Sequence, residues 1–260
     1  MNHDSAVIVS YLTERPISMS NPEDKAVIRC SNYAMKKAFK YWGYYHDQDN
    51  QDDQDDLDTA LKYCSLAIKI NPQNASAYAL RGSMYNSKQW FKRACRDLNK
   101  AISFGLHDEF VYTDLGFAHM LEHECSEAVN NFSIALAINP EHFSAWSNRG
   151  YTFIKMSLFE KAVPDLKIAL SLIPNDPIAL LNLNDAYYGR GNLYLKADRN
   201  LEAVDDFTKA TSSRDFIVKA YEGRATAYTN LGKMEEATAD IAKAKYFREE
   251  QEHSKMNSHG

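Results

Sequence analysis

The amino-acid sequence predicts an all-α chain of repeated, antiparallel helix pairs, and the spacing of its small residues predicts it. An alanine that opens an amphipathic run recurs at separations of 34, 34, 34, 41 and 34 residues, and a second alanine follows each one seven residues later. A glycine lies twelve residues before four of these alanines. Such a regular register indicates that each period is one structural unit. The opening alanines are Ala60, Ala94, Ala128, Ala162, Ala203 and Ala237.

The spacing within a period is that of a helix. Ala128, Phe132 and Ala135 stand at i, i+4 and i+7, which places them on one helical face. Small residues on that face let two helix backbones approach closely, and the bulky residue between them fills the groove. We call the small residue of the first helix the glycine slot; its occupants are Gly82, Gly116, Gly150, Gly191 and, in the last period, Ala225.

Proline ends the second helix in three periods, because it has no N–H and disfavours α geometry in the residue before it. Pro72 and Pro140 follow asparagine, and Pro174 occupies the same position in its period. Each period is therefore two helices and two short turns. Such a unit cannot bury its apolar face alone, and stacked neighbours bury it.

Two insertions interrupt the period. Five extra residues fall in the stretch 47–58, which contains seven Asp and no basic residue and predicts a solvated loop. Seven extra residues lie between Pro174 and Gly191. Because seven residues make two helical turns and preserve the facing of a helix, we expect one long helix from about Pro177 to Ala197.

Together these features resemble the tetratricopeptide repeat family over about residues 34–248. The resemblance includes an aromatic residue four before the glycine slot and an aromatic residue or histidine three after it. It implies a right-handed superhelical solenoid in which the first helices line a concave groove that binds a peptide or another protein. The residues at these two positions are Tyr78, Tyr112, Trp146, Tyr187 and Tyr221, and Tyr85, His119, Phe153, Tyr194 and Tyr228.

The domain organisation follows from the same register. We expect an irregular or capping segment over 1–30, a solenoid over 31–248 and a polar tail over 249–260. The six expected repeats span approximately 31–74, 75–108, 109–142, 143–176, 177–217 and 218–248.

Composition and charge narrow the class of protein. Hydrophobic residues make up 45% of the chain and charged residues 25%, which is ordinary for a protein with a buried core. The net charge of −5 disfavours nucleic-acid binding. No signal peptide or membrane-spanning segment is evident, and the four cysteines lack the spacing of a disulfide scaffold or a metal site. We expect a cytoplasmic protein with reduced thiols, no cofactor and no membrane insertion.

The candidate binding site follows from positions counted from the glycine slot. Residues two before, one after and four after it should face the groove that the resemblance implies. Aromatic faces there would take apolar side chains of an extended peptide, and amides would hold its backbone. The alternative is that several of these residues pack against the neighbouring repeat. The predicted groove residues are Tyr44, Asp114, Phe117, Met120, Asn148, Tyr151, Ile154, Tyr188 and Asn192.

One known groove chemistry is not expected. Some relatives clamp the C-terminal carboxylates of chaperones with Lys, Asn and Arg at fixed positions in three successive repeats. Here Asn148 fits that pattern, but its successors are Asp185 and Gly189. Lys219 also fits, with Gly223 where the pattern needs Arg. No window of three repeats completes the clamp.

Other candidate sites have simpler interpretations. His119, His123 and Cys125 could suggest a zinc site, but His119 holds an aromatic packing position and the other two fall at a turn. The acidic stretch lacks the Gly and the closing Glu of a calcium loop. Lys36, Lys37 and Lys40 beside Tyr41 and Trp42 are interpreted as a solvated basic face.

No catalytic motif is present: the sequence has no P-loop, nucleophile elbow, G-x-G-x-x-G or H-E-x-x-H. The sequence therefore predicts a non-catalytic scaffold or adaptor whose partner is a protein or an extended peptide. Two alternatives stay open. One is a metal-binding or enzyme-associated regulatory module that uses His119, His123 and Cys125, and the other is an RNA-binding helical repeat, which the acidic charge disfavours.

Overall fold

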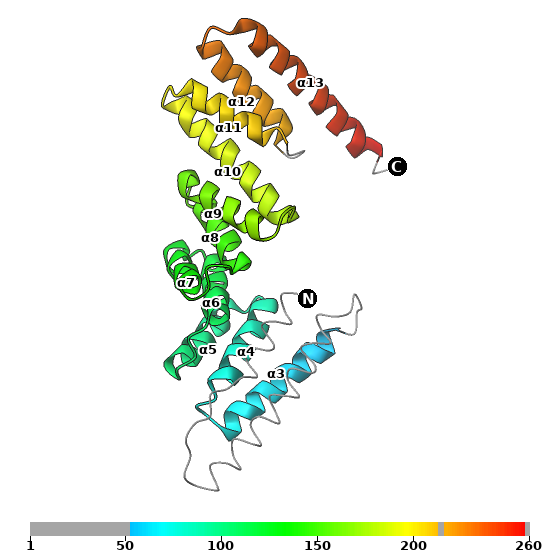
Figure 1. Ribbon diagram of the computed structural model, residues 1–260. Helices are drawn as coiled ribbons and strands as arrows, with labels where there is room; N and C mark the ends of the chain where they lie inside the picture. The colour runs from blue at the N-terminus through cyan, green and yellow to red at the C-terminus, as the bar shows by residue number, and fades with distance from the viewer. Residues whose placement is uncertain (1–52, 213–215, 258–260) are drawn as a thin grey trace. The chain divides into compact units, whose positions relative to one another are not determined.

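The computed structural model describes residues 53–212 and 216–257, and every regular element in those two stretches is an α-helix (Figure 1). The all-α prediction is confirmed for this part of the chain. The chain divides into two compact units, Met1–His142 and Phe143–Gly260. The helices are α3 (Asp53–Ile70), α4 (Ala75–Ser87), α5 (Phe91–Ser103), α6 (Glu109–Leu121), α7 (Cys125–Ile138), α8 (Phe143–Lys155), α9 (Phe159–Leu172), α10 (Pro177–Lys196), α11 (Asn200–Ala210), α12 (Ile217–Asn230) and α13 (Met234–Asn257).

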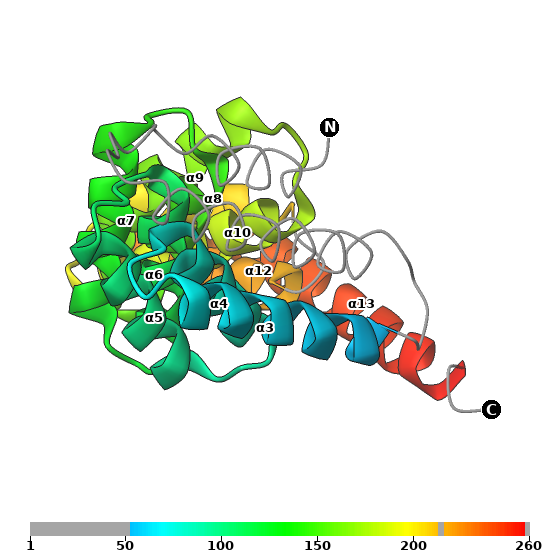
Figure 2. The ribbon, with the colours of Figure 1, turned by 90° about the horizontal axis from the view of Figure 1, so that it is seen from below.

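Within each unit the helices form hairpins, and each hairpin packs against the next. In the first unit α4 pairs with α5 and α6 with α7, while α3 lies along α4 and α5 along α6 (Figure 2). In the second unit the pairs are α8 with α9, α10 with α11 and α12 with α13. The first helices of successive hairpins also touch, α4 with α6 and α8 with α10, which in turn contacts α12. Each unit thus has a row of adjacent first helices.

The two helices of a hairpin pack tightly at the glycine slot. A Cβ atom added to Gly82 would lie 2.7 Å from Cγ of Leu98, and one added to Gly150 would lie 2.7 Å from Cγ of Leu166. In both hairpins the bulky residue stands four after the opening alanine, a position that we call the bulky slot. Its side chain is fully buried at Cys64, Leu98, Phe132, Leu166 and Phe207.

The last hairpin departs from this pattern because no described helix packs on its outer side. Ile241 occupies the bulky slot of α13 and is 59% exposed. Lys245 stands four residues further on, at a position that holds apolar residues in four earlier hairpins: Ile68, Ile102, Leu136 and Leu170. The same face that is apolar inside the array is therefore partly charged here.

The turns inside the hairpins share one backbone feature. The residue seven after the glycine slot has a positive φ in each turn, and the next residue donates its N–H to the carbonyl three after the slot. A left-handed residue of this kind ends a helix sharply. Only the last turn uses glycine. The left-handed residues are Gln89, His123, Ser157, Asp198 and Gly232, with φ of 58°, 64°, 58°, 55° and 73°.

The two insertions have different outcomes. The predicted long helix is confirmed, since α10 runs unbroken from Pro177 to Lys196. Asp176 begins it by accepting a hydrogen bond from the N–H of Ala179 at 2.8 Å. The predicted loop over 47–58 is wrong for its last part, because α3 begins at Asp53. Aspartates favour the positive N-terminal end of a helix dipole, so an acidic stretch suits a helix start.

The bulky slot gives a matched pair of stability measurements. Phe207→Ala should lower the free energy of unfolding by about 4 kcal/mol, because it leaves a cavity against Gly191 and Gly223. Ile241→Ala, at the same slot in the next hairpin, should cost less than about 1 kcal/mol because its side chain is already in water. Urea unfolding followed by circular dichroism measures both. Equal losses would contradict the difference in burial.

Candidate functional site

The predicted residues of the first unit lie together on α6. Asp114, Phe117 and Met120 follow one another at three-residue spacing. Met120 is buried, whereas Asp114 and Phe117 are half-buried. The Phe117 ring meets the ring of Phe91, at the start of α5, edge to face with centroids 6.4 Å apart. This part of α6 therefore lies against the preceding hairpin and still presents polar and aromatic surface.

Asn86 on α4 joins this group. Its side-chain Nδ2 donates a hydrogen bond of 2.9 Å to the backbone carbonyl of Asp114 and so ties α4 to α6. Its Oδ1 is buried and has no hydrogen-bond partner within the described residues. A buried acceptor that lacks a donor destabilises a protein by about 1–3 kcal/mol. Asn86 stands four after its glycine slot, a position expected to face the groove, yet the predicted set omitted it.

The predicted residues of the second unit lie on α8 and α10, which are in contact. On α8, Asn148 and Tyr151 are half-buried and Ile154 is buried. Lys155 places its Nζ 5.8 Å from the centroid of the Tyr151 ring. This face combines an amide, an aromatic ring and a cation.

On α10 the two predicted residues are already engaged. Asn192 donates from Nδ2 to the backbone carbonyl of Tyr188 at 3.0 Å. The Tyr188 ring packs against Phe207 and Phe216, with centroids 5.9 and 5.8 Å away. Tyr188 is therefore held between α10, α11 and the residue before α12. The ninth predicted residue, Tyr44, lies outside the described residues.

The row of first helices in the second unit also carries a charged residue, Asp185 on α10. Burial raises the pKa of this carboxyl, and Lys219 on α12 acts in the opposite direction. The face of α12 continues into a hollow of about 470 Å³ between α12 and α13. It is lined by both polar and apolar groups, from Glu222, Ala225, Thr226, Thr229, Asn230, Ile241, Ala244, Lys245 and Arg248.

A carboxylate clamp has no room in α10 and α12. The position where it needs a long polar side chain is Gly189 in α10 and Gly223 in α12. A Cβ on Gly189 would lie 2.4 Å from the Phe159 ring, and one on Gly223 would lie 2.6 Å from the Phe207 ring. Aromatic rings of the preceding second helix therefore occupy the space that an arginine would need.

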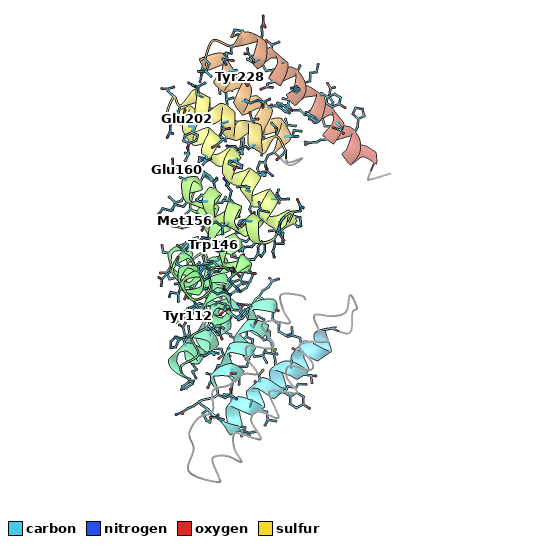
Figure 3. All side chains as sticks on the ribbon, viewed as in Figure 1. Tyr112, Trp146, Met156, Glu160, Glu202 and Tyr228 are labelled. Carbon is cyan, nitrogen blue, oxygen red and sulfur yellow. The ribbon has the colours of Figure 1, made fainter. Side chains whose placement is uncertain are left out.

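A second set of positions forms a polar lock within the hairpins. The arginine before the glycine slot makes two hydrogen bonds to an aspartate sixteen residues later, as in Arg190 to Asp206 at 2.7 and 2.9 Å. The guanidinium carbon also lies near the rings four before and three after the glycine slot, 5.6 Å from the Tyr187 centroid and 5.7 Å from the Tyr194 centroid. Two rings from the equivalent positions, Trp146 and Tyr228, are labelled in Figure 3. The four locks are Arg81–Asp97, Arg149–Asp165, Arg190–Asp206 and Arg224–Asp240.

The hairpin α6–α7 replaces the lock with other residues. Leu115 stands where the others have arginine, and Asn131 stands where they have aspartate. Both are buried, and Asn131 donates from Nδ2 to the carbonyl of Glu127 on its own helix. In this hairpin, a leucine and an asparagine that is hydrogen-bonded within its own helix therefore replace the arginine–aspartate pair, and neither is charged.

His119 and His123 have structural roles in this hairpin. His119 Nδ1 lies 2.6 Å from Oε2 of Glu124 across the turn, and His123 is the turn's left-handed residue. Within residues 53–212 and 216–257, no group of three or more His, Cys, Asp or Glu side chains is placed to hold a metal ion.

Comparison with known proteins identifies the repeat. Residues 188–249 match the model of the tetratricopeptide repeat family. Human tetratricopeptide repeat protein 6 is 27% identical over 205 residues, which are 77% of this chain and 38% of that protein. These matches support the assignment of tetratricopeptide repeats to this chain.

Other similar proteins agree with this assignment. Hsp70-Hsp90 organizing protein 1 of Glycine max is 27% identical over 193 residues, which are 72% of the chain and 32% of that protein. The crystal structure of YrrB, a TPR protein with an unusual peptide-binding site, has a TM-score of 0.57 at 21% identity and covers 74% of this chain and 97% of its own. This likeness confirms the predicted solenoid fold class. The chain spans less than two fifths of the length of the two curated relatives.

Two of the thiols, Cys95 and Cys64, are poor nucleophiles. Burial raises the pKa of Cys95 to about 11, with Glu124 and Glu122 adding to the effect. Burial also raises the pKa of the fully buried Cys64. Both thiols are therefore protonated at neutral pH. As for membranes, none of the described helices combines the length and hydropathy of a membrane span.

Leu115 and Asn131 occupy the lock positions in α6–α7, so the same two residues can be tested in another hairpin. Asp206→Asn should lower the free energy of unfolding by about 2 kcal/mol, because it leaves the half-buried Arg190 without its carboxylate. Arg190→Leu combined with Asp206→Asn should recover much of that loss, since it reproduces the α6–α7 solution. Urea unfolding of the two variants checks this expectation, and a double variant less stable than the single one would contradict it.

Proposed function

We propose that this tetratricopeptide repeat protein is a non-catalytic interaction scaffold whose first helices bind an extended segment of a partner protein. The observation that carries the proposal is the buried Oδ1 of Asn86, which has no hydrogen-bond partner among the described residues. A peptide lying across α4 and α6 would donate a backbone N–H to this oxygen by displacing the side chains that cover it. Satisfying a buried acceptor removes a penalty of the unbound protein, so it favours binding.

The surroundings of Asn86 suit an extended peptide. Asp114 and Phe117 lie on α6, which the amide of Asn86 contacts directly. The half-buried Phe117 ring offers an apolar surface for a peptide side chain, and the Asp114 carboxylate places negative charge on the same helix. The proposed peptide therefore pairs an apolar side chain with a nearby donor.

The second unit offers a similar surface of its own. Asn148 and Tyr151 on α8 and Asn192 on α10 are half-buried, on helices that contact one another. Support for peptide binding also comes from similar proteins: YrrB is a TPR protein with an unusual peptide-binding site, and the Glycine max relative is an Hsp70-Hsp90 organizing protein.

Asn86 gives a sharp test in the first unit. A displayed peptide library panned against the full chain supplies ligands, and isothermal titration calorimetry measures their affinity. Asn86→Ala should weaken peptides of this site about tenfold, because the acceptor is lost. The matched control is Asn130→Ala on α7, an exposed amide outside the proposed binding surfaces. Equal affinities of both variants for every selected peptide would refute a site at Asn86.

A second test addresses α8 and α10. Replacing Asn148, Tyr151 and Asn192 together by Ala should abolish capture of peptides that bind the second unit, while the helical circular dichroism signal stays intact. The three side chains are half-buried, so their removal leaves the glycine and bulky slots untouched. Undiminished capture by a folded triple variant would move the site to another surface.

A further inference from the structure

The outer face of α5 is a strip of positive charge. Its exposed side chains are Lys92, Arg93, Arg96, Asn99, Lys100 and Ser103. The helix has one acidic residue, Asp97, which is buried and held by two hydrogen bonds from Arg81. No carboxylate therefore belongs to the exposed face itself.

An exposed aromatic ring stands at each end of this strip. Trp90, the residue before α5, is 43% exposed, and the guanidinium carbon of Arg93 lies 4.7 Å from its ring centroid. Phe104, the residue after α5, is 40% exposed and packs against Tyr78 with centroids 5.6 Å apart. Lys100 places its Nζ 5.1 Å from the same Tyr78 ring. These contacts orient the cations before any ligand arrives.

Part of the charge in this region is already paired. Lys88, in the turn before α5, is largely buried and forms a 2.7 Å ion pair with Asp58. Lys92 lies 3.8 Å from a Glu122 oxygen. In contrast, Arg93, Arg96 and Lys100 form no ion pair with any acidic residue that the structure describes. Three cations are thus left for an external anion, and two of them, Arg93 and Lys100, lie against aromatic rings.

The strip is a property of this hairpin and not of the repeat. Arg93 and Arg96 stand one before and two after the opening alanine of α5. The same two positions hold Glu202 and Asp205 in α11. The stability of a hairpin therefore does not require cations at these two positions.

We propose that the outer face of α5 binds a short acidic segment of a partner protein, with carboxylates on Arg93, Arg96 and Lys100 and apolar side chains near Trp90 and Phe104. The 13 residues of α5 span roughly 20 Å at about 1.5 Å per residue. An extended peptide at about 3.3 Å per residue covers that length with roughly six residues. The expected ligand is therefore about six residues long, acidic in its centre and aromatic at its ends.

The surroundings favour a short peptide over a nucleic acid. Acidic groups border the strip: Asp58 lies at Lys88, and Glu122 and Glu124 lie close enough to influence Cys95 on α5. A polyanion longer than α5 would run into these carboxylates, and the whole chain carries a net charge of −5. A segment of the length of one helix avoids both sources of repulsion.

The probe is a fluorescein-labelled peptide, Trp-Glu-Glu-Glu-Glu-Phe, titrated with the full chain by fluorescence polarisation at low and at physiological salt. Binding should weaken as salt rises, because the contacts lie at the surface. Arg93→Glu combined with Arg96→Asp gives α5 the residues of α11 and should weaken binding at least tenfold with an unchanged melting temperature. Asn86→Ala should bind this probe normally, so failure here is distinguishable from failure of the proposed site on the first helices.

The matched control changes the net charge equally on another helix. Lys161→Glu combined with Lys167→Asp alters two exposed residues of α9 and should leave binding within about twofold. A similar loss in this control would overturn the proposal, because it would show an effect of net charge alone. Absence of binding to the native chain would also overturn it, as would displacement of the peptide by an equimolar single-stranded RNA of about twelve nucleotides.

Discussion

Close approach of two helix backbones at the glycine slot is the constraint on which each hairpin depends. A side chain at Gly82 or Gly150 would collide with the leucine of the facing helix. Because no Cβ separates the helices at the glycine, side chains next to the glycine can contact the second helix. The arginine–aspartate locks at Arg81 and Arg149 follow from this approach, since the residue beside the glycine then lies opposite its aspartate.

The positions that stabilise a hairpin differ from those that we propose for binding. The lock uses residues four before, one before and three after the glycine slot, whereas the proposed peptide surfaces use residues two before, one after and four after it. Leu115 and Asn131 show that the lock itself accepts a second solution. Recognition can therefore vary along a first helix while the interface with its partner helix stays intact. Tyr188 is the exception, because its ring is also part of the packing around Phe207.

The sequence predicted those features that depend on one helix and its spacing. The period of small residues was sufficient to find the hairpins, and a seven-residue insertion was sufficient to find the length of α10. Features that depend on neighbours were not predictable in the same way. Ile241 fits the bulky slot by spacing, yet its exposure depends on what packs outside α13. The unpaired oxygen of Asn86 arises from the direction in which its amide donates, toward α6.

The left-handed turn residues could not be predicted from the sequence for another reason. Gln89, His123, Ser157 and Asp198 are all polar but have four different functional groups, so their common role is visible only in the backbone. For an ordinary residue this conformation is less favourable than the right-handed one by about 1–2 kcal/mol, and glycine largely avoids that strain. Four hairpins therefore carry a small conformational burden that the fifth, with Gly232, does not. A single substitution by glycine at one of these four turn residues should therefore make the protein more resistant to heat. These turns lie away from the first-helix faces that we propose for recognition.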